Sequence, residues 1–342
     1  MKEAFKIGAI EAERAKTTLT RLQCSEYADG TPLTIPLVVV HGADPGPVLF
    51  LKGCQHGDEV IGALIAREVA ATVDPTALRG TLLIVPIANV PAFLTRSRGF
   101  SLEERGPLNM GYSFPGNKNG PLTDRIAYTL FHEVVLRSNY VIDLHAGLTG
   151  AVIYPFTYVV PSDNKYGTLE AREGIAKASG LPYVFRVSRE RASHFFFRPG
   201  PGDYDVTFGG QCDQKKIPRV LVEMGEGGKI TDEFVPVGIK AISNILKHLK
   251  MLPGKPELLL GKQRVFENYK QVRANRGGTL WMQTKVNAQV KKGDLLGRIY
   301  GPLDVMEEIV SPIDGVVLRV MTNAIVYPGA EVAWIIEVEK GA

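Results

Sequence analysis

The strongest structural signal in this chain lies in residues 49–62, which read LFLKGCQHGDEVIG. An apolar run stops at Gly53, and a histidine and an acid three residues apart, His56 and Glu59, precede the helical spacing that begins at Val60. This order is typical of a strand, a tight turn and the start of a helix. Open α/β sheets place their sites at the carboxyl ends of strands, so His56 and Glu59 are candidate metal ligands. The alternative is a polar turn whose acid complements the amino terminus of a helix.

The composition excludes several classes of protein. The 342 residues are 45% hydrophobic and 22% charged, which is ordinary for a globular protein with room for about two domains. The 40 basic and 36 acidic residues are dispersed, which gives no support to nucleic-acid binding. The first residues lack the apolar core of a signal peptide, and no stretch approaches the length of a membrane span. We therefore expect a cytoplasmic protein that binds neither nucleic acid nor membrane.

The three cysteines agree with a reducing compartment, because they are odd in number and show no CxxC spacing. Cys54 precedes His56 by two residues, so thiolate ligation is one interpretation of it. A small buried side chain at the end of a strand is the other, and it is the more common case.

Strand and helix patterns alternate through the first three quarters of the chain. The apolar run 48–51, the helical spacing of 60–72 and the run 81–87 predict a β-α-β unit with parallel strands. The run 33–40 contains Pro36, which favours an edge strand. Residues 88–121 form a long irregular segment rich in glycine and proline, and such segments are usually functional. Residues 195–210 are rich in glycine and aromatic residues and are predicted to form a second loop region.

A composition change near residue 251 divides the chain. The segment 251–256 reads MLPGKP and is typical of a linker. After it, short strand patterns alternate with turns rich in glycine, proline and aspartate, which predicts a small all-β domain. We therefore expect an α/β domain over residues 1–252 and a β domain over residues 255–342.

Three predicted strand ends carry groups that bind metals or protons. His145 ends the run 140–145, and Glu223 ends the run 219–223, in addition to the His56/Glu59 pair. Two histidines and one carboxylate would give a zinc ion three protein ligands and leave one position for water. Asp143 lies two residues before His145 and is suited to accept a hydrogen bond from an imidazole.

Each of these signals is weak in isolation, because a histidine after an apolar strand is more often a capping or core residue. The remaining histidines have no such context, and we expect them to be structural or exposed: His41, His132, His194 and His248. The combination of two strand-end histidines with a strand-end acid in one α/β pattern is what favours a metal site.

Several motifs resemble the succinylglutamate desuccinylase/aspartoacylase family of zinc carboxypeptidase-like enzymes. They are GCQHGDE at 53–59, NVPAF at 89–93 followed by Arg98, FPG at 114–116, DLH at 143–145 and VEMG at 222–225. They occur in the order of the family, and the resemblance extends over about residues 25–250. It implies a carboxypeptidase-like fold, with a mixed, mostly parallel sheet and helices on both faces.

The resemblance also implies the roles of the site residues. His56, Glu59 and His145 match the ligands of one zinc ion per chain. Glu223 matches the catalytic glutamate, the general base for a water activated by zinc. Arg98 matches the arginine that polarises the scissile carbonyl, and its planar, always-charged fork suits an oxyanion. A loop arginine is otherwise usually solvated.

The sequence departs from the family pattern just before the FPG motif. Many members carry an Asn-Arg pair there, which holds a substrate carboxylate, whereas this chain has Gly111 and Tyr112. Tyr112 and the nearby Asn109 are therefore candidate substrate-binding residues. Other arginines that could supply the missing guanidinium are Arg186, Arg191 and Arg198.

The C-terminal part resembles the biotinyl/lipoyl-like β-barrel through VKKGD at 290–294 and SPIDGVV at 311–317. In carrier domains of this kind the modified lysine would fall at Asp304. We therefore expect a module that shapes the cleft of the catalytic domain instead of a swinging-arm carrier.

These observations predict a metal-dependent amidohydrolase for carbon–nitrogen bonds other than peptide bonds. Its partner would be a small N-acylated amine or amino acid, which it would deacylate. The alternatives are a carboxypeptidase acting on short peptides and a non-catalytic zinc-binding protein of the same fold. Homo-oligomerisation stays open.

Overall fold

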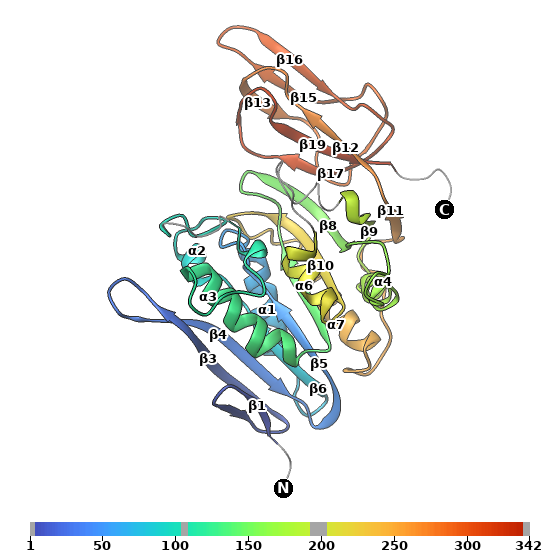
Figure 1. Ribbon diagram of the computed structural model, residues 1–342. Coiled ribbons are helices and arrows are strands. Elements are labelled where there is room, and N and C mark those ends of the chain that lie inside the picture. Colours follow the sequence, from blue (N-terminus) through green and yellow to red (C-terminus); the bar gives the residue numbers. More distant parts are fainter. Residues whose placement is uncertain (1–3, 104–108, 192–203, 338–342) are drawn as a thin grey trace.

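A large mixed sheet dominates the molecule and extends into both of its parts. The computed structural model describes residues 4–103, 109–191 and 204–337. Figure 1 shows an α/β body that carries the N-terminus and a smaller all-β unit, near the C-terminus, above it. Within these described ranges the main sheet has 13 strands, and its longest path runs β12-β19-β17-β8-β10-β7-β5-β6-β4-β3. The two parts therefore share one hydrogen-bonded framework.

The predicted β-α-β unit is confirmed. The helix α1 (Val60–Thr72) lies between the parallel strands β5 (Asp44–Lys52) and β6 (Arg79–Val85). The preceding strands are antiparallel, and they are β1 (Phe5–Ile7), β2 (Ile10–Ala12), β3 (Lys16–Glu26) and β4 (Pro32–His41).

The edge position expected for the strand with Pro36 is wrong for that strand as a whole, because β4 lies between β3 and β6. The pairing with β6 covers only Val38 to His41, however. Pro36 has a partner on the β3 side alone, in Arg21. The missing amide donor of the proline thus falls where no second strand needs it.

The centre of the sheet aligns the strand ends that matter for function. The strand β7 (Tyr140–His145) is parallel to both β5 and β10 (Arg219–Glu226). In this register His145 is the partner of Glu223. The next strands are β8 (Ala151–Val159), antiparallel to β10, and β9 (Tyr183–Arg186), parallel to β8. Parallel pairing brings the carboxyl ends of β5, β7 and β10 to one rim.

Helices cover both faces of this sheet, as expected. One face packs against α1, α4 (Leu169–Ala178) and α7 (Val235–His248), with Ile65, Ile175 and Ile245 in a shared apolar core. The other face packs against α3 (Leu122–Thr129), its helical continuation over residues 130–137, and α6 (Phe208–Gln214). Burial on both faces explains why β5 and β7 read as apolar runs. No described helix is both long and apolar enough to cross a membrane.

The second predicted loop region is partly helical. Of residues 195–210, the structure describes 204–210, which contain the short helix η4 (Tyr204–Val206) and the start of α6. The Thr207 side chain accepts a hydrogen bond from the backbone N–H of Gly210 and so caps α6. The glycine pair Gly209-Gly210 concealed this helix in the sequence, because glycine lowers helix propensity. Within the first long loop lie α2 (Val90–Leu94) and η1 (Met110–Tyr112).

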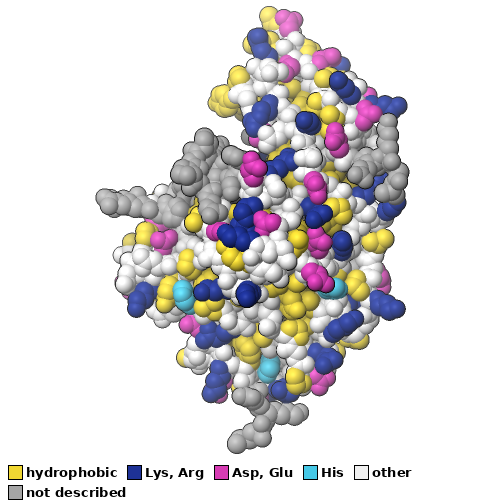
Figure 2. Space-filling view, turned by 45° about the vertical axis from the view of Figure 1, so that its right-hand side comes forward, with side chains coloured by type: hydrophobic (Ala, Val, Ile, Leu, Met, Phe, Trp, Pro, Cys, Tyr) yellow, Lys and Arg dark blue, Asp and Glu magenta, His cyan; other side chains and the backbone are white. Residues whose placement is uncertain are grey.

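The C-terminal strands form a small β unit whose two sheets enclose Leu280, Leu296 and Ile335. One sheet has the order β16-β15-β13-β18, and the strands β12, β19 and β17 belong to the main sheet. The strand β17 pairs with β8, with Arg319 opposite Ile153, and β11 pairs with β9. Figure 2 shows this narrower unit above the wider body, with acidic and basic side chains interspersed on that face. Its strands are β11 (Arg264–Phe266), β12 (Tyr269–Arg273), β13 (Gly278–Met282), β14 (Gln289–Val290), β15 (Leu295–Tyr300), β16 (Val305–Val310), β17 (Gly315–Met321), β18 (Ile325–Val326) and β19 (Glu331–Ile336).

Candidate metal centre and its cleft

The turn after β5 presents His56 and Glu59 to the rim of the sheet. A Cβ at Gly57 would lie 2.0 Å from the backbone carbonyl carbon of Ala92, so only glycine fits this close approach. Glu59 occupies the N-cap position of α1, but its side chain makes no capping hydrogen bond. The carboxylate is directed instead at two histidines, which argues against the simple helix-cap interpretation of the acid.

Three predicted ligands converge in a buried cluster. Glu59 Oε1 lies 2.6 Å from Nδ1 of His56, and Glu59 Oε2 lies 2.7 Å from Nδ1 of His145. One ligand atom from each of the three residues lies within 4.8 Å of the others, and all three side chains are buried. The backbone N–H of Ala146 donates to Glu59 Oε2 over 3.2 Å. The carboxylate and both Nδ1 atoms therefore face one small space.

The outer nitrogen of each imidazole faces an oxygen. His56 Nε2 is 3.0 Å from Asn109 Oδ1, and His145 Nε2 is 3.2 Å from Asp143 Oδ1. An oxygen acceptor at Nε2 favours the tautomer whose Nδ1 lone pair is available. With an ion in place of the Nδ1 protons, the donor set would be two neutral imidazoles and one carboxylate, which fits zinc with an open fourth position. The residues present thus suit the ion that the sequence implied.

Cys54 is not among these ligands. Its Sγ contacts the backbone oxygen of Glu59 over 3.3 Å, and burial raises the pKa of the thiol to about 12. The residue adopts a φ of +43°, which is unusual for a side chain larger than glycine. The structure therefore agrees with a small buried side chain at the end of the strand.

Electrostatic interactions within the cluster are strong. Burial acts to raise the pKa of Glu59, but His56 and His145 hold it well below its usual range. Burial acts to lower the pKa of His145, yet the Asp143 and Glu59 carboxylates raise it to about 9. For His56, burial is the larger effect and lowers the pKa. The carboxylate is thus held as an anion between two imidazoles, a charge distribution suited to a cation.

Behind His145 lies a charge network centred on Asp143, in which Asp143 and Lys52 are fully buried and Arg219 is largely buried. Lys52 Nζ is 3.0 Å from Asp143 Oδ1, and Arg219 Nε donates to Asp143 Oδ2 over 2.9 Å. The Lys52 ammonium also lies over the ring of Phe208, 3.7 Å from its centroid. Burial of so many charges is unfavourable unless they are paired, and here each has a partner. The network fixes the carboxylate that contacts His145.

Glu223 and Arg98 reach the same space from different elements. Glu223 is aligned with His145 across β10 and β7, and a register shift towards β8 follows it. Burial and repulsion by Glu59 raise the pKa of Glu223 to about 8. Arg98 comes from the loop after α2, and its Nη1 donates to Glu59 Oε1 over 3.1 Å. The structure thus brings together the five residues that the sequence proposed for the reaction.

These side chains open into a large cleft of about 1330 Å³. One wall belongs to the α/β body and includes His56, Glu59, Arg98 and Glu223. The opposite wall comes from the β unit, as expected for a module that shapes the cleft. Its residues are Tyr269, Gln271, Arg273, Arg319, Glu331 and Trp334.

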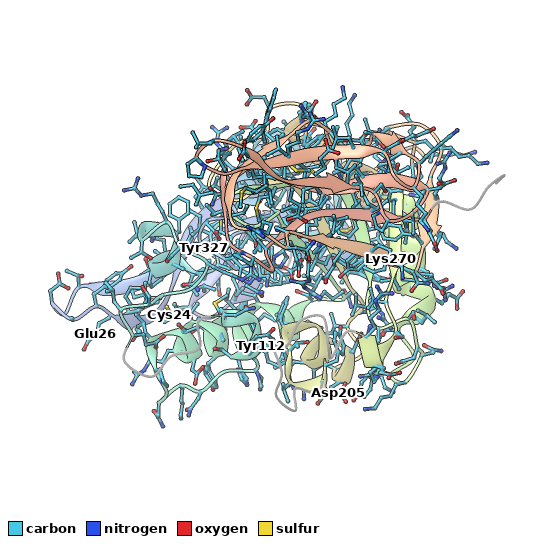
Figure 3. All side chains as sticks on the ribbon, turned by 90° about the horizontal axis from the view of Figure 1, so that it is seen from above. Cys24, Glu26, Tyr112, Asp205, Lys270 and Tyr327 are labelled. Atoms are coloured by element: carbon cyan, nitrogen blue, oxygen red, sulfur yellow. The ribbon has the colours of Figure 1, made fainter. Side chains whose placement is uncertain are left out.

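The residues proposed for substrate binding occupy different positions. Tyr112 is half-buried and lines the cleft, and Figure 3 shows it on the α/β body beside the outline of the β unit. Asn109 also lines the cleft, but its Oδ1 contacts His56 and accepts the backbone N–H of Gly111 over 2.9 Å. Asn109 therefore has a contact to a metal-ligand candidate that the sequence did not predict.

The candidate replacement arginines differ in the same way. Arg186 is paired with Glu173, 3.1 Å away, and does not line the cleft. Arg191 lines the cleft but donates to the backbone oxygen of Glu267 over 2.8 Å. Arg198, like His194, lies outside the described residues.

Sequence reasoning missed Lys52, Arg219 and Arg319. Lys52 and Arg319 stand inside apolar strand runs, LFLK and VVLRV, and a charge there is costly to bury without a partner. A charged residue in an apolar run was also what singled out Glu223 in the sequence. The partners of Lys52 and Arg319 come from other strands, so their roles could be assigned only from the folded structure.

Comparison with known proteins identifies the family. Residues 45–249 match the Succinylglutamate desuccinylase/Aspartoacylase catalytic domain. The N-alpha-acetyl-L-2,4-diaminobutyric acid deacetylase of Halomonas elongata is 28% identical over 316 residues, which cover 89% of this chain and 86% of that protein. The product-bound structure of the ectoine utilization protein EutE (DoeB) from Ruegeria pomeroyi has a TM-score of 0.78 at 25% identity and covers 98% of this chain and 99% of its own. The succinylglutamate desuccinylase/aspartoacylase structure from Rhodobacter sphaeroides has the same fold, with a TM-score of 0.81 at 22% identity and full coverage of both chains. The chain therefore belongs to the succinylglutamate desuccinylase/aspartoacylase family, as its motifs indicated.

Proposed function

We propose that this protein is a zinc-dependent deacylase that hydrolyses the amide bond of a small N-acylated amine or amino acid. The observation that carries the proposal is the alignment of Glu223 with His145 in neighbouring strands, beside the buried cluster of His56, Glu59 and His145. This arrangement supplies metal ligands and a proton acceptor on one rim. The family assignment and the named deacetylase relative support amide hydrolysis.

His56, Glu59 and His145 would hold the ion in this proposal. A bound zinc ion supplies Lewis acidity and lowers the pKa of coordinated water towards about 7. The oxygens of Asn109 and Asp143 keep the two imidazoles oriented.

Glu223 and Arg98 would perform the proton transfer and the charge stabilisation. Glu223 takes a proton from the attacking water and returns it to the leaving amine nitrogen. Its raised pKa, about 8, suits a group that must both accept and donate near neutral pH. The Arg98 guanidinium binds the carbonyl oxygen as negative charge develops there. Arg98 reaches this position from a loop, and its partly exposed side chain lines the cleft beside Glu59.

The substrate is proposed as a small N-acyl compound, and N-alpha-acetyl-L-2,4-diaminobutyric acid is the first compound to test because a relative is named for it. The test combines metal analysis of the purified protein with a panel of N-acetyl and N-succinyl amino acids. Glu223→Gln should lower kcat by about 10² to 10⁴ while the bound zinc stays the same. Glu173→Gln, a half-buried acid on α4 outside the cleft, is the matched control.

Two results would contradict the proposal. A metal-free protein that hydrolyses the panel at the same rate would exclude the zinc mechanism. A Glu223→Gln variant as fast as wild type would exclude the assigned base. Faster release of a C-terminal residue from dipeptides than of any acyl group would favour the carboxypeptidase alternative.

A further inference from the structure

The β unit contributes one buried arginine to the wall of the cleft. Arg319 lies on β17, and 4% of its surface is exposed. The strand is bulged between Val317 and Arg319. Arg319 therefore shares the face of Trp334, its partner on β19, while Val317 points into the core of the β unit.

Cross-strand pairing places the neighbours of Arg319 on the same wall. Arg319 is the partner of Ile153 on β8 and of Trp334 on β19, and Trp334 is in turn the partner of Gln271 on β12. All four residues line the cleft. Residues paired across strands present their side chains on the same face of a sheet. This row therefore runs from the α/β body into the β unit along one side of the cleft.

The Arg319 guanidinium lacks the hydrogen bonds that a buried arginine normally makes. Its Nη1 is buried without a hydrogen-bond partner among the described residues. Glu331 Oε2 lies 3.7 Å from that nitrogen, beyond hydrogen-bond distance. The same carboxylate already accepts from Trp334 Nε1 over 3.0 Å and from Arg273 Nη2 over 2.5 Å. Glu331 thus provides a nearby negative charge but does not saturate Arg319.

Two other buried arginines make more hydrogen bonds than Arg319, although Nε of Arg172 also lacks a hydrogen-bond partner among the described residues. Arg172 donates to the backbone oxygens of Pro161 and Asp163 over 2.6 and 3.0 Å. Arg219 donates through Nε to Asp143 over 2.9 Å. A buried, incompletely bonded guanidinium is costly to keep, and a bound ligand that pairs with it is one explanation of such a group. Arg319 differs from Arg172 in that it lines the cleft, and from Arg219, which also lines the cleft, in that it makes no hydrogen bond to a carboxylate among the described residues.

The position of Arg319 suits one end of a substrate. It is close enough to Glu223 to lower the pKa of that carboxyl, as Arg98 also does. A ligand with its amide at Glu223 and Arg98 can therefore extend towards β17. The described turn at Gly111 and Tyr112 offers no guanidinium for a carboxylate. The indole of Trp334, with the Arg319 guanidinium 5.0 Å from its ring centroid, adds an apolar surface beside the charge.

We propose that Arg319, on the β unit, is the residue of the cleft that binds the carboxylate of the substrate. The assignment rests on the proposed deacylase function and specifies which residue recognises the substrate. The planar fork of a guanidinium matches a carboxylate bidentately, and Nη1 of Arg319 has no hydrogen-bond partner among the described residues. The specificity for the substrate is then supplied by the β unit, across the cleft from the metal ligands.

The test measures a preference, because Arg319 could instead act only by stabilising the anion of Glu223. The substrate pair is the N-acetyl amino acid that wild type hydrolyses fastest and its carboxamide. Wild type should prefer the carboxylate. In Arg319→Met the ratio of the two kcat/KM values should fall by about 10- to 100-fold, mainly through KM. In Arg319→Lys, which keeps the charge without the planar fork, the ratio should lie between those of wild type and Arg319→Met.

Arg298→Met is the matched control, because Arg298 is on β15 of the same β unit, pairs with Glu308 and does not line the cleft. Its preference should equal that of wild type. A second comparison locates the carboxylate in the substrate: an N-succinyl alkylamine carries it on the acyl side, whereas the N-acetyl amino acid carries it on the amine side. A fall of kcat/KM in Arg319→Met that is confined to one of these two substrates supports the proposal and shows on which side of the amide Arg319 binds the carboxylate.

Two outcomes would overturn the proposal. One is a wild type that hydrolyses carboxylate and carboxamide equally well. The other is an Arg319→Met variant that loses the same factor on both, which would make Arg319 an electrostatic neighbour of Glu223.

Binding separates this proposal from the proposed reaction. Dissociation constants for the same compounds are measured with Glu223→Gln and with Glu223→Gln/Arg319→Met. If wild type hydrolyses nothing, the deacylase function fails, and these constants still test Arg319. A carboxylate preference that the second substitution removes supports the proposal, and equal constants overturn it.

Discussion

Asp143 Oδ1 lies 3.2 Å from Nε2 of His145 and joins a metal-ligand candidate to buried cations. Lys52 and Arg219 contact the same carboxylate, and both Asp143 and Lys52 are fully buried. Burial acts to raise the pKa of Asp143, but Lys52, His145 and Arg219 keep it well below the usual range. Asp143 is thus held as an anion behind His145, on the side away from the cluster of ligand atoms.

Replacing Asp143 should weaken metal binding. Asp143→Asn lowers the basicity of the group facing His145 and should reduce zinc affinity by about 10- to 100-fold. It should also lower the free energy of unfolding, because Lys52 and Arg219 lose their buried counter-charge. Zinc affinity is measured by competition with a chelator after the melting temperature has been checked. Asp74→Asn, in an exposed turn, is the control, and equal affinities in both variants would contradict the role of Asp143.

Asn109 should position His56 in the same way. Asn109→Ala removes the oxygen 3.0 Å from His56 Nε2 and should weaken zinc binding by about 10-fold. Asn109→Asp keeps an acceptor at that position and should retain more of the affinity. If the alanine and aspartate variants bind zinc equally, the oxygen at residue 109 has no part in orienting the imidazole.

Arg98 should act on the reaction and not on the metal. Arg98→Met should lower kcat by about 10² to 10³ because one donor to the developing oxyanion is lost, with little change in zinc content. Arg96→Met is the matched control, since Arg96 is an exposed arginine of the same loop. Equal kcat values for the two variants would remove Arg98 from the mechanism.

Lys52 should make stability depend on pH. Burial lowers the pKa of Lys52 from 10.5 to about 8, and Asp143 opposes this shift. Between these two values the unfolded chain binds more protons than the folded chain, so the contribution of Lys52 to the free energy of unfolding rises with pH. Below about pH 8 both states are protonated and the contribution is constant.

Urea denaturation of wild type and Lys52→Met at a series of pH values tests this sign. The difference in unfolding free energy, wild type minus variant, should increase from pH 8 to 10.5. A level difference across that window would show that Lys52 keeps its ordinary pKa in the folded protein, and a decrease would show that the folded-state pKa is raised.

Local sequence was sufficient for the elements and for most of the cluster. The spacing of residues 49–72 predicted β5, the turn and α1, because the change from an apolar run to helical periodicity is a property of neighbouring residues. His145 and Glu223 could be added because parallel strands align their carboxyl ends. The helix α6 was missed because Phe208-Gly209-Gly210 has low helix propensity, and its stability comes from packing on the sheet.

The sequence alone indicated the family through the resemblance of its motifs. It also predicted the α/β fold and the residues that converge on the proposed ion, since these follow from local periodicity and strand-end position. Three-dimensional packing supplied what local patterns do not encode. The contact of Asn109 with His56, the charges around Asp143 and the entry of Arg319 into the cleft all join residues far apart in the chain. The position of Arg319 depends on the pairing of β17 with β8, and the charges around Asp143 depend on burial between strands, and neither is a property of adjacent residues.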